Sequence, residues 1–268
     1  MTVDEPARRI SVTSSDGIEI VGAALGTGPA LALTYGAMME QVGWAKLLPY
    51  LQLERAIYTY DRRGRGESGD ADHHTVELEV DDLVAFVESM PEPRDLFGHS
   101  SGALLALHAV QRGLRVRRLV LYEPPMAGVR EPRLRSDLPS ELEALIAQGD
   151  RDGALALFFR EGMDQLAENV QRLRDGPRWQ DQLRYAQTGA YDVRITASFE
   201  FEPGRLRQIG VPVLFLCGTE SPPWMREGVE RFAGAVPGSR LELLEGQGHN
   251  AQFTAPEVLA EAVGRFLS

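Results

Sequence analysis

The alternation of short apolar segments with helical patterns is the feature that most restricts the fold of this chain. Segments rich in β-forming residues, such as 30–34 and 56–60, alternate with stretches whose apolar residues recur at helical spacing, such as 76–90. Strands joined through helices form a mostly parallel sheet, because each helix must cross a face of the sheet between two strands. The chain is therefore predicted to have an α/β fold. The predicted strands are 18–24, 30–34, 56–60, 95–98, 117–122, 211–217 and 241–244, and the predicted core helices are 44–51, 76–90, 101–112, 225–235 and 256–267.

The alternation is interrupted once, by a segment with almost no strand pattern. Ser140-Glu141-Leu142-Glu143 has the capping-box pattern and predicts a helix that begins there. Three more helices are expected, at 152–160, 164–174 and 177–187. We therefore expect an α/β core in two parts, 1–123 and 204–268, with a helical lid formed by 124–203 over one end of the sheet.

Charge and composition restrict the partners. The 268 residues carry a formal net charge of −11, which disfavours nucleic acid and anionic membranes as partners because phosphate binding needs a basic surface. No run approaches the ~18 apolar residues of a membrane span, and residues 1–9 lack the apolar stretch of a secretion signal. Cys217 is the only cysteine, and no group of side chains has metal-ligand spacing. A cytoplasmic protein without cofactor or metal is expected, and no oligomeric state is predicted.

Gly98-His99-Ser100-Ser101-Gly102 is the strongest chemical motif in the chain. It follows a predicted strand and opens a predicted helix, the context in which G-x-S-x-G indicates a nucleophilic serine. A serine on so sharp a turn is strained, and side chains two residues before and after it would collide, so both positions need glycine. An ordinary Gly/Ser-rich turn is the alternative, and the position between strand and helix disfavours it. Ser100 is the predicted nucleophile.

A serine hydroxyl needs a base within hydrogen-bonding distance. His249 lies in the loop 246–250, after a predicted strand and before the last helix, and so at the same carboxyl edge of the sheet as Ser100. His99, next to the nucleophile, is predicted to face the sheet, and His108 to be structural. His249 is therefore the predicted base.

Over nearly its whole length the chain resembles the α/β-hydrolase family. The resemblance is carried by the 98–102 motif, Asp-Arg-Arg-Gly-Arg-Gly-Glu-Ser at 61–68, the segment 121–125 and Gly248-His249. It implies an eight-stranded sheet, a helical lid after the sixth strand, and an oxyanion hole formed by the backbone N–H groups of Ala37 and Ser101. The family's usual His-Gly after the third strand is replaced by Tyr35-Gly36, but backbone donors do not depend on side-chain identity.

The acidic partner of His249 departs from the family pattern. Such enzymes commonly carry Gly-x-x-Asp after the seventh strand, whereas this chain has Gly218-Thr219-Glu220-Ser221, with serine at the acid position. A catalytic histidine needs a partner for its Nδ1–H to fix the tautomer. Glu123, at the end of the sixth strand, is preferred. Glu220 is the alternative acid, and Ser221 is a candidate supporting contact.

The predicted pocket is mostly apolar, with Tyr35, Met38, Met126 and Trp224 as candidate lining residues. The sequence favours a serine hydrolase that cleaves a hydrophobic carboxylic ester or lactone through an acyl-enzyme on Ser100. Thioester and carbon–carbon bond hydrolysis stay open, because fold and triad do not decide between them. Two alternatives of other classes are a non-hydrolytic enzyme of this fold, such as a lyase, cyclase or cofactor-free oxygenase, and a ligand-binding protein with a residual triad.

Overall fold

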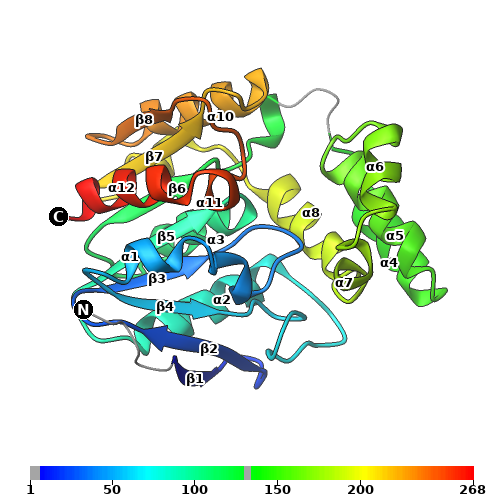
Figure 1. Ribbon diagram of the computed structural model, residues 1–268, viewed down its shortest axis with the longest axis horizontal. Helices are drawn as coiled ribbons and strands as arrows, with labels where there is room; N and C mark the ends of the chain where they lie inside the picture. The colour runs from blue at the N-terminus through cyan, green and yellow to red at the C-terminus, as the bar shows by residue number, and fades with distance from the viewer. Residues whose placement is uncertain (1–6, 130–133) are drawn as a thin grey trace.

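A computed structural model describes residues 7–129 and 134–268 of the chain. One eight-stranded sheet runs through the molecule in the order β1-β2-β4-β3-β5-β6-β7-β8 (Figure 1). The pairs β1–β2 and β2–β4 are antiparallel and the remaining pairs are parallel, as an α/β fold requires. The predicted sheet is thus confirmed. The strands are β1 Arg8–Thr13, β2 Glu19–Leu25, β3 Ala30–Thr34, β4 Ala56–Tyr60, β5 Arg94–His99, β6 Leu119–Tyr122, β7 Val213–Gly218 and β8 Arg240–Leu244.

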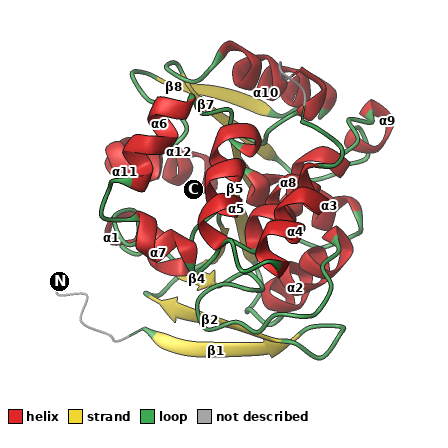
Figure 2. Ribbon diagram, turned by 90° about the vertical axis from the view of Figure 1, so that its right-hand side faces the viewer, coloured by secondary structure: helices red, strands yellow, loops and turns green. Residues whose placement is uncertain are grey.

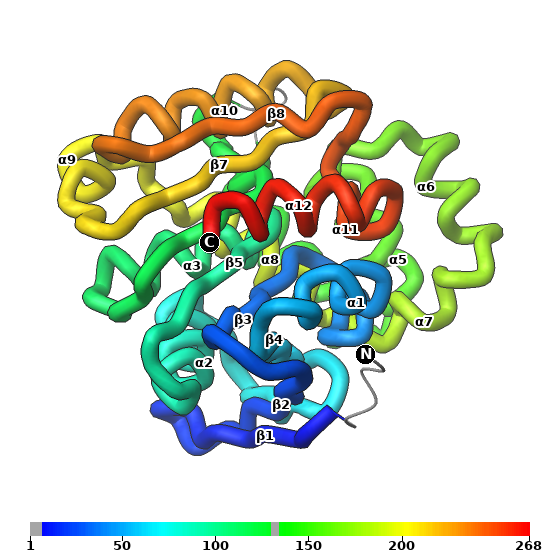
Figure 3. The backbone as a smooth tube through the Cα atoms, turned by 60° about the vertical axis from the view of Figure 1, so that its left-hand side comes forward, coloured from blue at the N-terminus to red at the C-terminus, as the bar shows by residue number. Residues whose placement is uncertain are grey.

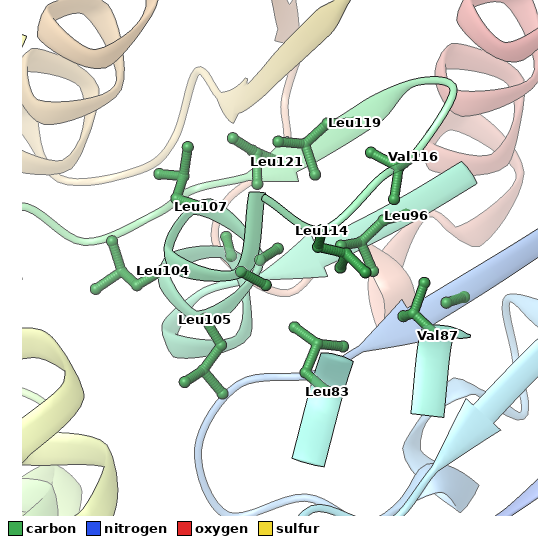
Figure 4. Close-up of a cluster of buried hydrophobic side chains, with 14 of the residues drawn as sticks. Leu83, Val87, Leu96, Leu104, Leu105, Leu107, Leu114, Val116, Leu119 and Leu121 are labelled. Atoms are coloured by element: carbon green, nitrogen blue, oxygen red, sulfur yellow. The ribbon is translucent and has the colours of Figure 1, made fainter. Parts of the chain in front are cut away.

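Helices cover both faces of the sheet, because side chains of the central strands alternate between two buried clusters. Ala30 and Ala32 of β3 point into one cluster, and Leu31 and Leu33 into the other. The first cluster is closed by α2, α3 and α10, and Figure 4 shows leucines of α2 and α3 meeting those of β5 and β6. The second is closed by α1 and α12, which lie on the other face (Figure 3). The core helices are α1 Leu48–Leu51, α2 Val76–Glu88, α3 Ser101–Gln111, α10 Pro223–Ala235, α11 Ala251–Thr254 and α12 Pro256–Leu267.

A helical insertion separates β6 from β7 and lies at one end of the strands, on the right in Figure 1; Figure 2 looks onto this insertion. Its own core is formed by residues such as Leu155, Phe158 and Trp179. The predicted segments 1–123 and 124–203 include residues 1–6 and 130–133, which lie outside the described part of the chain. The inserted helices are α4 Leu138–Ala147, α5 Arg151–Leu157 with a π-helical continuation Phe158–Gly162, α6 Ala167–Arg174, α7 Trp179–Leu183, α8 Thr188–Ser198 and α9 Pro203–Leu206.

Two local predictions differ from the structure, and two elements were not predicted. The capping box is wrong, because α4 begins at Leu138 and Ser140 lies inside the helix. The segment 44–51 is not one helix but a 3-10 turn, Gln41–Trp44, followed by the short α1. The strand β1 and the helix α8 were not predicted at all. None of the described helices combines the length and the apolar character that crossing a lipid bilayer requires.

Candidate active site

Ser100 occupies a strained turn between β5 and α3. Its backbone angles are φ 55° and ψ −126°, a conformation that residues with side chains rarely adopt. The flanking glycines are required by space. A Cβ on Gly98 would lie 2.6 Å from the Cα of Ala103, and one on Gly102 would lie 2.5 Å from the carbonyl oxygen of Tyr35. The sharp turn is therefore possible because the residues two positions before and two positions after Ser100 are glycines.

A hydrogen-bonded chain links Ser100 to a histidine and a glutamate. The Nε2 atom of His249 lies 3.0 Å from Ser100 Oγ, and its Nδ1 atom lies 2.6 Å from Glu123 Oε2. The three residues follow β5, β6 and β8, so the parallel order of these strands brings them to one edge of the sheet. The His249 loop is held in place by Tyr122, whose hydroxyl donates to the Gly248 carbonyl, and by His99, whose Nε2 lies 2.9 Å from the His249 carbonyl oxygen.

Glu123 is fully buried and is held by several donors. Its Oε1 accepts hydrogen bonds from the backbone N–H of Gly218 at 2.7 Å and from the Ser221 hydroxyl at 2.5 Å. Burial by itself raises the pKa of this carboxyl, but the hydrogen bond and charge of His249, together with the other two donors, bring the pKa below its usual range. Glu123 is therefore ionised and aimed at His249.

Glu220, the alternative acid, does not reach this chain. Its side chain is exposed, and its backbone N–H is bound to the carbonyl of Gln247 at 2.8 Å. The structure therefore brings together Ser100, His249, Glu123 and Ser221, and leaves Glu220 outside.

The backbone that precedes Ala37 passes directly against the serine. A Cβ on Gly36 would lie 2.7 Å from the Cβ of Ser100, and Ala37, Ser100 and Ser101 line the same cavity. Residues 37 and 101, whose backbone N–H groups are the predicted oxyanion donors, therefore lie on the wall of the cavity that also contains Ser100. The Ser101 side chain points elsewhere, since its hydroxyl donates to Asp192 at 2.8 Å.

The cavity at Ser100 has a volume of about 240 Å³ and a mostly apolar lining. Met126 and Trp224 line it as predicted, and the insertion contributes Phe158, Met163 and Val193. Its polar lining residues besides Ser100, Ser101 and His249 are Gln165, Asp192, Thr196 and Asn250.

Two predicted pocket residues lie elsewhere. Tyr35 is fully buried with Leu31 and Leu33, as the two-residue period of the preceding strand dictates, and its hydroxyl accepts from the backbone N–H of Arg62 at 2.9 Å. Met38 lines a neighbouring cavity, which shares Phe158 with the cavity at Ser100. Contrary to the prediction, neither Tyr35 nor Met38 lines the cavity at Ser100. Within the described part of the chain, no three His, Cys, Asp or Glu side chains are placed to hold a metal ion.

The sheet order, the strained serine turn and the Ser–His–Glu chain are those of an α/β hydrolase. The sequence profile of the alpha/beta hydrolase family matches residues 31–262, so the chain belongs to this family and is a hydrolase. It is similar to an alpha/beta hydrolase from Sphaerobacter thermophilus DSM 20745, with 34% identity and a TM-score of 0.88 over 97% of this chain and 100% of that one.

Two further relatives are similar over most of their length. A pimeloyl-(acyl-carrier protein) methyl ester esterase from Xanthomonas campestris pv. campestris strain B100 is 24% identical over 91% of this chain and 97% of that protein. A thermophilic esterase from Thermogutta terrifontis shares the fold, with 22% identity and a TM-score of 0.77 over 97% of this chain and 98% of that one.

Proposed function

We propose that the protein is a serine hydrolase that cleaves a hydrophobic carboxylic ester or lactone through an acyl-enzyme on Ser100. The observation that carries this proposal is the hydrogen-bonded chain Glu123–His249–Ser100, which ends at an apolar cavity. A buried carboxylate, an imidazole and a hydroxyl in this order are the groups that acyl transfer needs.

The reaction has two steps. As Ser100 Oγ attacks the carbonyl carbon, His249 Nε2 accepts the hydroxyl proton, and the charge that develops on the carbonyl oxygen is stabilised by the N–H groups of Ala37 and Ser101. His249 then gives the proton to the leaving alcohol, which leaves an acyl group on Ser100. Water then attacks this ester while His249 Nε2 accepts a proton from it, and His249 returns this proton to Ser100 Oγ as the acyl–oxygen bond breaks and the acid is released. Glu123 keeps the His249 proton on Nδ1, so that Nε2 faces the serine as an acceptor.

The cavity favours an uncharged, apolar acyl group of modest size. Asp192 contributes a carboxylate to its wall, but this carboxylate is neutralised by ion pairs with Arg62 at 2.9 Å and Arg65 at 2.7 Å. A volume of about 240 Å³ favours short and medium acyl chains over long ones. Residues 124–203 serve as the lid, because several of the lining side chains come from this insertion.

The serine at the family's usual acid position gives weight to a non-hydrolytic enzyme. Glu123 supplies the missing carboxylate from the end of β6, at 2.6 Å from His249. This contact supports hydrolysis over the non-hydrolytic alternative. The name of the Xanthomonas relative, a methyl ester esterase, agrees with ester cleavage.

Hydrolysis of p-nitrophenyl acetate, butyrate and decanoate and of a δ-lactone by the purified chain tests the proposal. We expect turnover of butyrate to exceed that of decanoate, and Ser100→Ala to abolish turnover of every substrate. Ser11→Ala, which changes an exposed serine on β1, is the matched control and should equal the wild type. Equal rates for the wild type and Ser100→Ala would contradict the proposed function.

A further inference from the structure

We propose that Arg62 and Asp192 are positioning residues that hold the two backbone donors of the oxyanion hole, so that the helical insertion supports the chemistry as well as covering it. This inference rests on the proposed function. It arises from a buried ion cluster that contacts the carbonyl groups of Tyr35 and Gly36 and the Ser101 hydroxyl, and whose Asp192 also lines the substrate cavity.

Arg62 reaches both halves of the oxyanion hole with a single nitrogen. Its Nη1 atom lies 3.2 Å from the carbonyl oxygens of Tyr35 and Gly36, 3.1 Å from Ser101 Oγ and 2.9 Å from Asp192 Oδ1. The Arg62 side chain is 1% exposed, so these contacts lie away from bulk solvent. The guanidinium is a rigid, planar donor, which makes it suited to fixing several oxygens at once.

The contact with Gly36 determines the direction of a catalytic donor. The Gly36 carbonyl and the Ala37 N–H belong to one planar peptide unit and point in opposite directions. When Arg62 holds the carbonyl oxygen, the N–H on the opposite side is fixed as well. Because this backbone lies against Ser100, the fixed N–H is aimed at the region where the oxyanion forms.

Asp192 brings the insertion into this arrangement. It lies on α8, and its Oδ1 accepts from the Ser101 hydroxyl at 2.8 Å and from Arg62 at 2.9 Å. Its Oδ2 accepts from Arg65 at 2.7 Å. On the other side of Arg62, the Nε atom donates to Glu79 Oε2 at 2.7 Å. Two carboxylates from different elements thus set the orientation of Arg62, and one of them also holds the Ser101 side chain.

The neighbouring ion pair Arg63–Asp82 provides a control that distinguishes an effect on the oxyanion backbone from a general loss of stability. Its distances are 2.6 Å from Nε to Oδ2 and 2.8 Å from Nη2 to Oδ1, and it is buried as deeply as the Arg62 cluster. Arg63 makes further contacts with Asp16, Ser14 and the Leu78 carbonyl, none of which belongs to the site. Removal of the Asp82 charge therefore disturbs a buried ion pair of the same motif without touching the oxyanion backbone.

The second-order rate constant for fluorophosphonate labelling of Ser100 is the first readout, because negative charge develops on the phosphoryl oxygen during attack. We expect Asp192→Asn and Arg62→Lys to lower this constant by about tenfold or more, a fraction of the loss caused by removing a donor outright. Asp82→Asn should stay within about twofold of the wild type at a comparable loss of Tm. Equal losses of rate in Asp192→Asn and Asp82→Asn, or an unchanged rate in Asp192→Asn, would overturn the inference.

A second variant and a second readout keep the inference testable if Asp192→Asn fails to fold. Ser101→Ala removes only the hydroxyl and should slow labelling by about threefold or more, whereas an unchanged rate would speak against positioning. The backbone amide NMR signal of Ala37 should shift in Ser101→Ala, those of Ala37 and Ser101 should shift in Asp192→Asn, and both should stay in place in Asp82→Asn. Unmoved signals in the first two would overturn the inference. If the signals shift in these variants but the wild-type protein never reacts at Ser100, the positioning contacts would be supported and the proposed function would be refuted.

Discussion

Replacement of Glu123 with glutamine tests the acid assignment through the tautomer of His249. Two donors, the Gly218 N–H and the Ser221 hydroxyl, point at Oε1 of the glutamate, at 2.7 Å and 2.5 Å. In the glutamine variant the amide oxygen must take this position, because an amide NH₂ there would face two donors. The NH₂ group then faces His249 Nδ1 and donates to it.

The consequence is the wrong tautomer at the serine. With Nδ1 accepting a hydrogen bond, the imidazole proton moves to Nε2, which lies 3.0 Å from Ser100 Oγ and can no longer take the hydroxyl proton. The equivalent change in a serine protease triad lowers kcat by about 10⁴-fold. We expect a loss of this order here, about 5 kcal/mol of transition-state stabilisation at 1.36 kcal/mol per factor of ten. KM should change little, because Glu123 does not line the cavity.

Steady-state hydrolysis of p-nitrophenyl butyrate measures the effect, with Glu220→Gln as the matched control. Glu220 is exposed and makes no contact with His249, so its variant should keep the wild-type kcat. Near-full activity of Glu123→Gln, with a loss of several hundred-fold in Glu220→Gln, would refute the assignment.

Two further predictions concern the backbone beside Ser100 and the histidine next to it. Gly36→Ala should lower kcat by about 100-fold, because its Cβ would lie 2.7 Å from the Ser100 Cβ and displace the nucleophile, whereas Gly204→Ala, in open space, should have no effect on kcat. Burial lowers the pKa of His99 to about 3, and its Nε2–H donates to the His249 carbonyl. Since the unfolded chain binds this proton near pH 6.5 and the folded chain does not, the free energy of unfolding should fall as the pH drops from about 6.5 towards 3. Urea denaturation of His99→Gln should show a smaller fall over this range, and parallel curves for the two proteins would contradict the assignment.

The residues of the proposed triad could be predicted from the turn motif and the order of the strands. The glycines at 98 and 102 are required by the turn itself, and the ends of β5, β6 and β8 meet at one edge once the strands are parallel. Glu123 could be preferred over Glu220 because it ends the sixth strand at the same sheet edge, whereas Glu220 lies one residue before the family's usual acid position. These inferences need strand order but no side-chain packing.

The supporting cluster could not be predicted, because it depends on how the insertion docks. Asp192 lies 91 residues from Ser101 and on a helix that the sequence pattern did not indicate. The strand β1 was missed although Ile10 and Val12 alternate with polar residues, since so short an edge strand carries little apolar signal. Tyr35 lies two residues after Leu33 and therefore points into the same buried cluster, which the pocket prediction did not take into account.

Labelling of the purified chain with a fluorophosphonate, mapped by peptide mass spectrometry, tests the central claim most directly. The phosphorus centre mimics the tetrahedral intermediate, so it reports an activated serine before any substrate is known. We expect one label per chain, on Ser100, and none on Ser100→Ala. A folded wild-type protein that stays unlabelled, or that carries its label on another serine, would contradict the acyl-enzyme mechanism.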